Sequence, residues 1–320
     1  MSTFSAQSSI TIQAPIEEVF DKVVYFEEMN KWSPWLIMDS EANVERLGED
    51  GTLGATHIWD GPMIGYGELK NTHIEPLKSI IGEVNFSRPM NARSKINFKF
   101  SARAQYDFSE LDEQHTQVSW TMQGQLPWTL ALAKSTIERS VKADYKRGLT
   151  MLKEYCEQGE ITSKVEVLGT KVGQAFDYIG LKENTSLDQL PQRQTENFTQ
   201  LYTYLQERHL PDSQIAFTMY HRYDTNKDRC QYTAGLSLNQ LPDITPEPFI
   251  SGTIAAGSAL VVKHTGAYTN LPNAWETGQL YLKHHGLKFN AKSSPLEIYV
   301  SDPRNTPVKD LVTMIYFPVK

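Results

Sequence analysis

The residues best suited to chemistry lie in the segment PLEIYVSDP, residues 295–303. Side chains alternate along a strand, so Glu297, Tyr299 and Ser301 share one face of this segment. The opposite face is apolar and is expected to meet a core; it carries Leu296, Ile298 and Val300. Glu297 then lies either on a solvated sheet surface, the usual place for a single glutamate, or in an aromatic-lined hollow. In a hollow, a desolvated carboxylate would attract an organic cation or accept a proton.

Other groups of chemically capable residues lack the spacing of a metal site. His284 and His285 are adjacent, so on a helix they point in different directions. Imidazoles just before Gly286 suit the C-terminal end of a helix, where they interact favourably with its dipole. The remaining histidines show no metal spacing with cysteines or carboxylates; they are His57, His73, His115, His209, His221 and His264. We therefore expect no metal and no cofactor.

The segment DTNKD, residues 224–228, imitates the start of a calcium loop and then departs from it. Position six of such a loop would be Arg229, where glycine is needed, and position twelve would be Gly235, where a bidentate glutamate is needed. A polar hairpin turn explains the segment. Cys230, close by, has charged neighbours but no identifiable base, so the sequence does not support a nucleophile there.

Length and composition indicate two globular domains in a reducing compartment. The chain has 320 residues, of which 40% are hydrophobic and 22% are charged. No apolar run approaches the ~18 residues that cross a bilayer, and the first fifteen residues lack the features of a secretion signal. The two cysteines, Cys156 and Cys230, define no disulfide framework. We expect a cytoplasmic protein without membrane contact.

The charge is acidic and divides unevenly. Residues 1–160 carry 16 Lys and Arg against 23 Asp and Glu, whereas residues 161–320 carry 15 of each kind, for a net charge of −7. Neither half shows the clustered basic residues that neutralise phosphates. We therefore expect no nucleic-acid binding by this chain alone.

The chain is predicted to divide at 159–163, between a domain at 1–158 and a domain at 164–320. Before this linker, apolar residues recur at steps of three or four and predict a helix from about Thr129 to Cys156. Its apolar stripe consists of Ile137, Val141, Tyr145, Leu149, Leu152 and Cys156. Upstream, a strand at SSITIQAP and a helix at IEEVFDKVV precede several short strands, of which Ile80–Phe86, Ile96–Phe108 and Thr116–Gln123 are the clearest. We expect an α+β fold in which this helix lies against an antiparallel sheet.

Five of the six tryptophans belong to the first domain; they are Trp32, Trp35, Trp59, Trp120 and Trp128. Large rings usually fill the space between a curved sheet and its helix. The alternative is that Trp35, Trp59 and Trp120 line an apolar cavity for a small ligand. Composition leaves both interpretations open.

Residues 5–158 resemble the SRPBCC superfamily of START-like and polyketide-cyclase-like proteins. The resemblance rests on ITIQAPIEEVFDKVVYFEEMNKWSPW, on WDGPMIGYGE and on the ending ADYKRGLTMLKEYCE. It implies a helix-grip fold, in which a curved antiparallel sheet wraps round the long C-terminal helix and leaves a hydrophobic tunnel. The superfamily shares no catalytic set, so the resemblance implies a cavity and assigns no active residue.

The second half contains an internal repeat. Residues 164–238 and 250–319 each predict strand, helix and hairpin, with helices at TENFTQLYTYLQERHL and LPNAWETGQLYLKHHGL. The segments DTNKD (224–228) and DPRNT (302–306) occupy matching hairpin turns. Two such units are expected to associate with pseudo-twofold symmetry and to leave a concave seam for a ligand.

Residues 161–320 are similar to the GyrI-like family, the effector-binding domains of AraC- and MerR-type multidrug regulators. The similarity rests on VVKHTGAYTNLPNAWETGQLYLKHHGL, PLEIYVSDP and the ending IYFPVK. In that family, the glutamate of the E-x-Y strand lies in an aromatic pocket that receives lipophilic, often cationic compounds. The resemblance implies a ligand site at the matching positions, which are Glu297, Tyr299, Tyr268, Trp275, Tyr316, Tyr178 and Phe176.

The favoured interpretation is a binding protein for a small lipophilic molecule, cationic where Glu297 supplies the counter-charge. The regulators of the family join this domain to a helix-turn-helix segment, and residues 1–160 show no such pattern, so a regulator of transcription is not predicted. One alternative, which the resemblance also implies because some GyrI-like proteins are hydrolases, is a hydrolase of small reactive electrophiles, with Glu297 as general base and Tyr268 or Tyr299 as hydrogen-bond donor. Another is a protein that sequesters a larger partner. The identity of the ligand and the oligomeric state stay open.

Overall fold

The computed structural model describes residues 2–89, 97–126, 128–210, 215–225, 227–242 and 244–320. By packing, residues 1–163 and 268–286 form one compact unit, and residues 164–267 and 287–320 form a second. The first unit ends its main segment at Ser163, the last residue of the predicted linker. The division into domains at 1–158 and 164–320 stays a prediction, and by packing residues 268–286 belong to the first unit.

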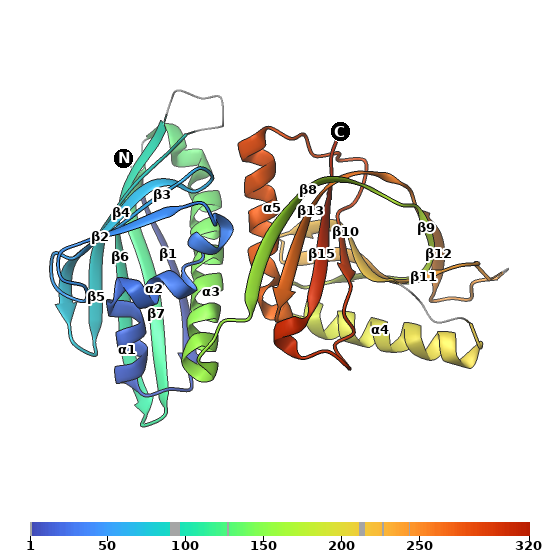
Figure 1. Cartoon of the computed structure of the whole chain (residues 1–320), viewed down its shortest axis with the longest axis horizontal. Helices are drawn as coiled ribbons and strands as arrows, with labels where there is room; N and C mark the ends of the chain where they lie inside the picture. The colour runs from blue at the N-terminus through green and yellow to red at the C-terminus, as the bar shows by residue number, and fades with distance from the viewer. Residues whose placement is uncertain (1, 90–96, 127, 211–214, 226, 243) are drawn as a thin grey trace. The chain divides into compact units, whose positions relative to one another are not determined.

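The first unit contains a seven-stranded antiparallel sheet in the order β1-β7-β6-β5-β4-β3-β2 (Figure 1). The strands are β1 Ser2–Ile12, β2 Asn43–Leu47, β3 Thr56–Gly61, β4 Gly65–Glu75, β5 Ser79–Pro89, β6 Asn97–Asp112 and β7 His115–Leu126. The predicted strands at Ile80–Phe86 and Thr116–Gln123 fall within β5 and β7. The predicted strand at Ile96–Phe108 falls in β6 from Asn97, since residue 96 lies outside the described residues.

The long helix α3, Lys134–Gln158, packs against β1 and β7 and makes this unit a helix-grip domain. It begins five residues later than predicted, because Trp128–Ala133 form a 3-10 helix, η2. It ends at Gly159, whose φ of 77° is the left-handed conformation that glycine adopts readily. The predicted apolar stripe is confirmed: Tyr145, Leu149 and Leu152 are fully buried in the core.

The first unit also contains four short helical elements, one of which lies in its second segment, residues 268–286. They are α1 Ile16–Val24, α2 Phe26–Trp32, η1 Leu36–Met38 and η3 Tyr268–Asn270, and η3 runs into α5, Leu271–His285. α5 packs on η1, and it ends at Gly286 with a φ of 64°, as the sequence predicts for the segment around His284 and His285.

Polar side chains join η3 and α5 to α3. The Asn270 Nδ2 donates to Glu154 Oε2 at 2.6 Å, and Asn273 Oδ1 accepts from Arg147 Nη1 at 2.9 Å. Arg147 is buried and also forms an ion pair with Asp144 at 2.7 Å. A buried charge needs partners of this kind, so these contacts tie the second helix of the repeat to the helix-grip domain.

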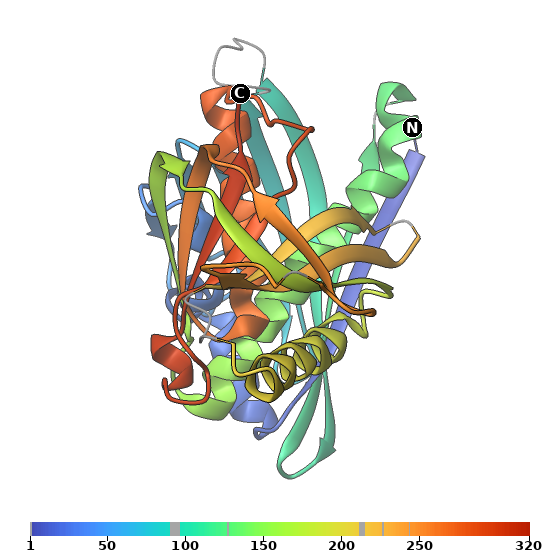
Figure 2. The ribbon, with the colours of Figure 1, turned by 90° about the vertical axis from the view of Figure 1, so that its right-hand side faces the viewer.

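The second unit contains an eight-stranded antiparallel sheet in the order β12-β9-β11-β10-β14-β15-β13-β8. Its strands, coloured from yellow-green to red, face the viewer in Figure 2. Its elements are β8 Ser163–Gly173, β9 Phe176–Thr185, α4 Leu190–Glu207, β10 Ala216–Asp224, β11 Arg229–Leu238, β12 Ile250–Ile254, β13 Gly257–Gly266, β14 Leu296–Tyr299, η4 Val308–Asp310 and β15 Val312–Pro318.

The strand order confirms the internal repeat. The first repeat supplies β9, α4, β10 and β11, and the second supplies β13, α5, β14 and β15. The two hairpins meet edge to edge where β10 pairs with β14. The segment 302–306 lies in the connection β14–β15, and the described residues of 224–228 lie at the connection β10–β11. β8 and β12, which precede the repeats, pair with the first strand of the opposite repeat, as the order shows.

α4 covers β9 and β11 and closes the core of the second unit. Leu201 and Leu205 of α4 are buried with Ile179, Ala234 and Leu236 of the sheet. Within the described part of the chain, none of the helices combines the length and the apolar character needed to cross a bilayer.

A charged cluster fastens α1 and α2 to α3. The carboxylate of Glu28 accepts from Lys22 at 2.9 Å, from Lys31 at 2.7 Å and from the hydroxyl of Tyr155 at 2.6 Å. Burial alone would raise the pKa of Glu28, but these hydrogen bonds and the charge of Lys22 outweigh it and lower the pKa from 4.5 to about 2.

Since the folded state binds fewer protons than the unfolded state between these two values, we expect stability to fall as the pH falls from about 4.5 towards 2. Glu28→Gln should lower the free energy of unfolding by about 1 kcal/mol near neutral pH and by much less near pH 2. Urea unfolding across this range measures the effect, with the exposed Glu49→Gln as the control. A deficit of Glu28→Gln that is the same at every pH would contradict the account.

Candidate functional site

Glu297 lies in β14, at the junction of the two repeats, and is only 3% exposed. It pairs with Thr218 of β10 and with Ile315 of β15, so the sheet flanks it on both sides. The expectation that the apolar alternate residues form the buried face is wrong for this segment. Leu296 and Ile298 are half-buried, and Val300 follows the strand and is 59% exposed.

The reason is that the face of Glu297 is the face that α4 covers. Gln194 of α4 donates through Nε2 to Thr218 Oγ1 at 3.1 Å and to the hydroxyl of Tyr220 at 3.2 Å. The rings of Phe198 of α4 and Tyr299 of β14 meet edge to face with centroids 5.6 Å apart. A helix therefore takes the place of solvent above this carboxylate.

Two tyrosine hydroxyls converge on one oxygen of Glu297. Tyr220 donates to Oε2 at 2.9 Å and Tyr299 donates to the same atom at 2.8 Å. The hydroxyl of Tyr299 donates its one proton to Glu297, so in its 3.0 Å hydrogen bond with Thr218 the hydroxyl of Thr218 is the donor. Hydrogen bonds to a charged acceptor are the strong ones, so this chain from α4 to Glu297 holds the carboxylate in place.

Burial and the charge of Glu297 affect the neighbouring acids. Burial, followed by the charge of Glu297, raises the pKa of Tyr220 well above its ordinary value of 10, so its hydroxyl stays a donor. The same two causes raise the pKa of the fully buried Cys230 thiol to about 12. Cys230 is therefore a protonated thiol at neutral pH, and a protonated thiol is a poor nucleophile.

Tyr316 lies on the opposite face of the sheet from Glu297. It pairs with Leu296, the neighbour of Glu297 in β14, and residues directly opposite in antiparallel strands point to the same face. The register between β14 and β15 decides which face Tyr316 occupies. The resemblance to the family does not specify this register.

Phe176 and Tyr178 of β9 also lie on that opposite face. Their ring centroids are 5.5 and 5.3 Å from that of Phe217, which pairs with Ile298 and therefore shares a face with it rather than with Glu297. Tyr268 and Trp275 lie on η3 and α5, in the first compact unit. Within the second unit, the predicted residue that contacts Glu297 is Tyr299.

Sequence reasoning missed four residues that contact the Glu297 cluster: Gln194, Phe198, Thr218 and Tyr220. The repeat held the necessary signal, since hairpins related by a twofold axis meet through equivalent strands, here β10 and β14. Thr218 and Tyr220 alternate along IAFTMYHRYD as Glu297 and Tyr299 do along LEIY. Aligning the two hairpins would have placed them on one face.

In the helix-grip domain, Trp35 and Trp120 belong to a packed set of rings. Trp120 stacks on Tyr145 with centroids 3.8 Å apart and on Tyr106 at 4.8 Å, and Trp35 meets it edge to face at 5.6 Å. Trp59 lies apart on β3, over Gly67, where a Cβ atom would come within 2.1 Å of the indole.

Three polar atoms in that ring set have no hydrogen-bond partner among the described residues. They are Trp120 Nε1 and the hydroxyls of Tyr106 and Tyr145, all buried. Buried polar groups are normally satisfied, so these atoms call for an acceptor. The rings of Trp35 and Trp120 pack against their neighbours, as the packing interpretation expects. A ligand cavity lined by Trp35, Trp59 and Trp120 stays a prediction.

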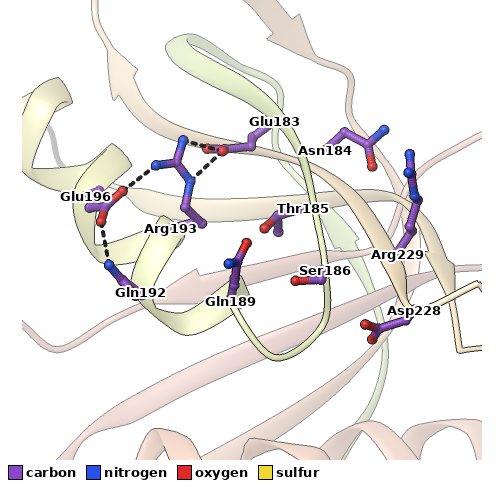
Figure 3. Close-up of a pocket in the computed structure, with 10 residues that line it drawn as sticks. All are labelled: Glu183, Asn184, Thr185, Ser186, Gln189, Gln192, Arg193, Glu196, Asp228 and Arg229. Atoms are coloured by element: carbon purple, nitrogen blue, oxygen red, sulfur yellow. Dashed lines mark hydrogen bonds and ion pairs between the residues drawn. The ribbon is translucent and has the colours of Figure 1, made fainter.

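A polar pocket of about 570 Å³ lies elsewhere in the second unit (Figure 3). It is formed by the end of β9, the first turns of α4 and the start of β11, and Glu297 is not among the residues that line it. Within the described residues, no group of three or more His, Cys, Asp or Glu side chains is arranged to hold a metal.

Comparison with known families confirms both resemblances seen in the sequence. Residues 3–157 match the family described as polyketide cyclase / dehydrase and lipid transport, and residues 174–320 match the GyrI-like small molecule binding domain. The chain is therefore a helix-grip domain of the first family joined to a GyrI-like domain. Its C-terminal part belongs to a family of small-molecule binding domains. No curated protein sequence matches the chain.

Solved structures resemble the chain distantly. The C-terminal domain of EcmrR is 17% identical, covering 49% of this chain and 98% of that one with a TM-score of 0.39. SAV2435 bound to tetraphenylphosphonium is 16% identical, covering 48% and 94%, with a TM-score of 0.37. The Aha1 dimer from Colwellia psychrerythraea is 18% identical, covering 50% and 98%, with a TM-score of 0.32. At these values the likenesses carry no conclusion about function.

We expect Tyr299→Phe to lower the free energy of unfolding by about 2 kcal/mol, because it withdraws a donor from a buried carboxylate. Tyr316→Phe is the matched control: it removes a hydroxyl from the neighbouring strand on the other face and should cost under about 0.5 kcal/mol. Urea unfolding measures both. Equal losses in the two variants would mean that the hydroxyl of Tyr299 does not support Glu297.

Proposed function

We propose that the GyrI-like domain binds a lipophilic organic cation at Glu297. The observation that supports this proposal most directly is a carboxylate that is 3% exposed and accepts from two tyrosine hydroxyls beneath an aromatic side chain of α4. A buried carboxylate favours an opposite charge, and aromatic faces attract cations that are weakly hydrated. Since water is largely excluded, the electrostatic attraction is stronger there than at the surface.

The binding residues in this proposal are Glu297, Tyr299 and Tyr220, with Phe198 as an aromatic wall. Because Glu297 is covered, a ligand must displace side chains above it, and the tyrosine hydroxyls must turn to the ligand or give it room. A neutral ligand of the same shape would gain the apolar contacts without the charge interaction. The charge-dependent part of the affinity therefore isolates the role of Glu297.

The proposal concerns ligand binding and not control of transcription. The net charge of −7 and the sequence pI of about 5.7 favour a chain that does not bind nucleic acid by itself, and this stays a prediction. A cytoplasmic location is likewise an expectation from the cysteine content.

We expect Glu297→Gln to weaken the binding of tetraphenylphosphonium at least about tenfold, which corresponds to 1.4 kcal/mol, because the counter-charge is lost. The affinity for triphenylphosphine oxide, which is similar in shape but neutral, should change by less than about twofold. Isothermal titration calorimetry on the full chain measures both, with Glu207→Gln at the exposed end of α4 as the control variant.

Equal loss for the cation and for the neutral compound would contradict a role for the charge, and unchanged binding of both would contradict a site at Glu297. The hydrolase alternative predicts a different result. Incubation with small reactive electrophiles, followed by mass spectrometry, would then yield products with the native chain and none with Glu297→Gln.

A further inference from the structure

The polar pocket of Figure 3 differs in kind from the Glu297 cluster. All ten side chains that line it are polar or charged, and none is apolar or aromatic. Such a lining offers hydrogen bonds and charges but little apolar surface, so it suits a small hydrophilic molecule and not a lipophilic one. The volume of about 570 Å³ is ample for a molecule of amino-acid size.

One wall of the pocket has its charges already satisfied. Arg193 of α4 donates through Nε to Glu183 Oε1 at 2.6 Å and forms an ion pair with Glu196 at 2.5 Å. Glu183 also accepts from Asn197 at 2.9 Å, and Glu196 accepts from Gln192 at 2.9 Å. These groups shape the wall and bind α4 to β9, and they leave little for a ligand.

The opposite wall carries two adjacent charges of opposite sign, Asp228 and Arg229. Among the described side chains neither forms an ion pair, and the contact of Asp228 is the backbone N–H of Leu187, at 3.3 Å from Oδ1. Both side chains are exposed to the pocket and to solvent. Their charges are therefore open to a ligand.

In the matching connection of the second repeat, an Asp and an Arg pair with each other. There Arg304 donates to Asp302 through Nε at 3.0 Å and through Nη2 at 2.7 Å, and its guanidinium lies 4.8 Å from the ring centre of Tyr202. In the first repeat, Asp224, which matches Asp302, likewise pairs with Arg222, at 2.8 Å. Asp228 and Arg229 follow this pair and form no ion pair with a described side chain.

A hydroxyl between the two walls is the second feature of a binding site. Thr185, at the end of β9, is only 8% exposed and lines the pocket, and no hydrogen bond to its hydroxyl is found within the described residues. A hydroxyl can both donate and accept a hydrogen bond, so this group can meet a ligand in the pocket. Ser186 and Gln189 line the pocket beside it.

From these features we infer that the pocket binds a free amino acid. Its carboxylate pairs with the guanidinium of Arg229, and its ammonium pairs with the carboxylate of Asp228. The side chain or the second carboxylate oxygen meets the hydroxyl of Thr185. A plain anion would be repelled by Asp228, and a plain cation by Arg229, so the two adjacent charges select a molecule that carries both.

The test uses saturation-transfer NMR and calorimetry on the full chain with the common amino acids one by one. For the tightest binder, the two analogues that lack either the ammonium or the carboxylate should bind at least about tenfold more weakly, since each leaves one wall charge unpaired. Arg229→Gln and Asp228→Asn should each cause a similar loss. Arg304→Gln, in the self-paired turn, is the matched control and should leave binding unchanged.

Binding of the deaminated or decarboxylated analogue as tightly as the amino acid would overturn the inference, as would a lack of binding by every amino acid at millimolar concentration. Equal losses in Arg229→Gln and Arg304→Gln would also overturn it. Glu297→Gln keeps the pocket intact and should not affect amino-acid binding, so this result is independent of the proposed cation site.

Discussion

The second unit depends on keeping one carboxylate away from water at the centre of its sheet. Glu297 is placed where the two repeats join, and a buried charge persists only when its neighbours hydrogen-bond to it. Tyr220 from one repeat and Tyr299 from the other both donate to the same oxygen. The symmetry of the fold thus supplies one donor from each half, and α4 closes the cluster from above.

The helices of the two repeats have different roles. α4 packs on its own sheet and holds Gln194 and Phe198 over the Glu297 cluster, whereas α5 packs in the first unit through Asn273, and η3 before it through Asn270. The second helix carries Asn273, whose amide oxygen accepts from Arg147 of α3.

The sequence predicted the elements well because they rest on local periodicity. The stripe of α3, the strands of the helix-grip sheet and the repeat of the second half are each visible within short windows. The membership of the site was harder to predict, because Tyr220 and Glu297 are 77 residues apart and meet only through the pairing of β10 with β14. Likewise Tyr316 and Tyr178 were grouped with Glu297 on residue type, whereas register places them on the other face.

The central claim is that Glu297 is the counter-charge of a lipophilic cation held under α4. A crystal structure of the full chain with tetraphenylphosphonium tests it most directly. We expect density for the phosphonium beside the Glu297 carboxylate, with phenyl groups against Tyr299 and Phe198 and with the tyrosine hydroxyls rearranged. Density for the cation at any other place in the chain, with the two hydrogen bonds to Glu297 Oε2 unchanged, would contradict the account.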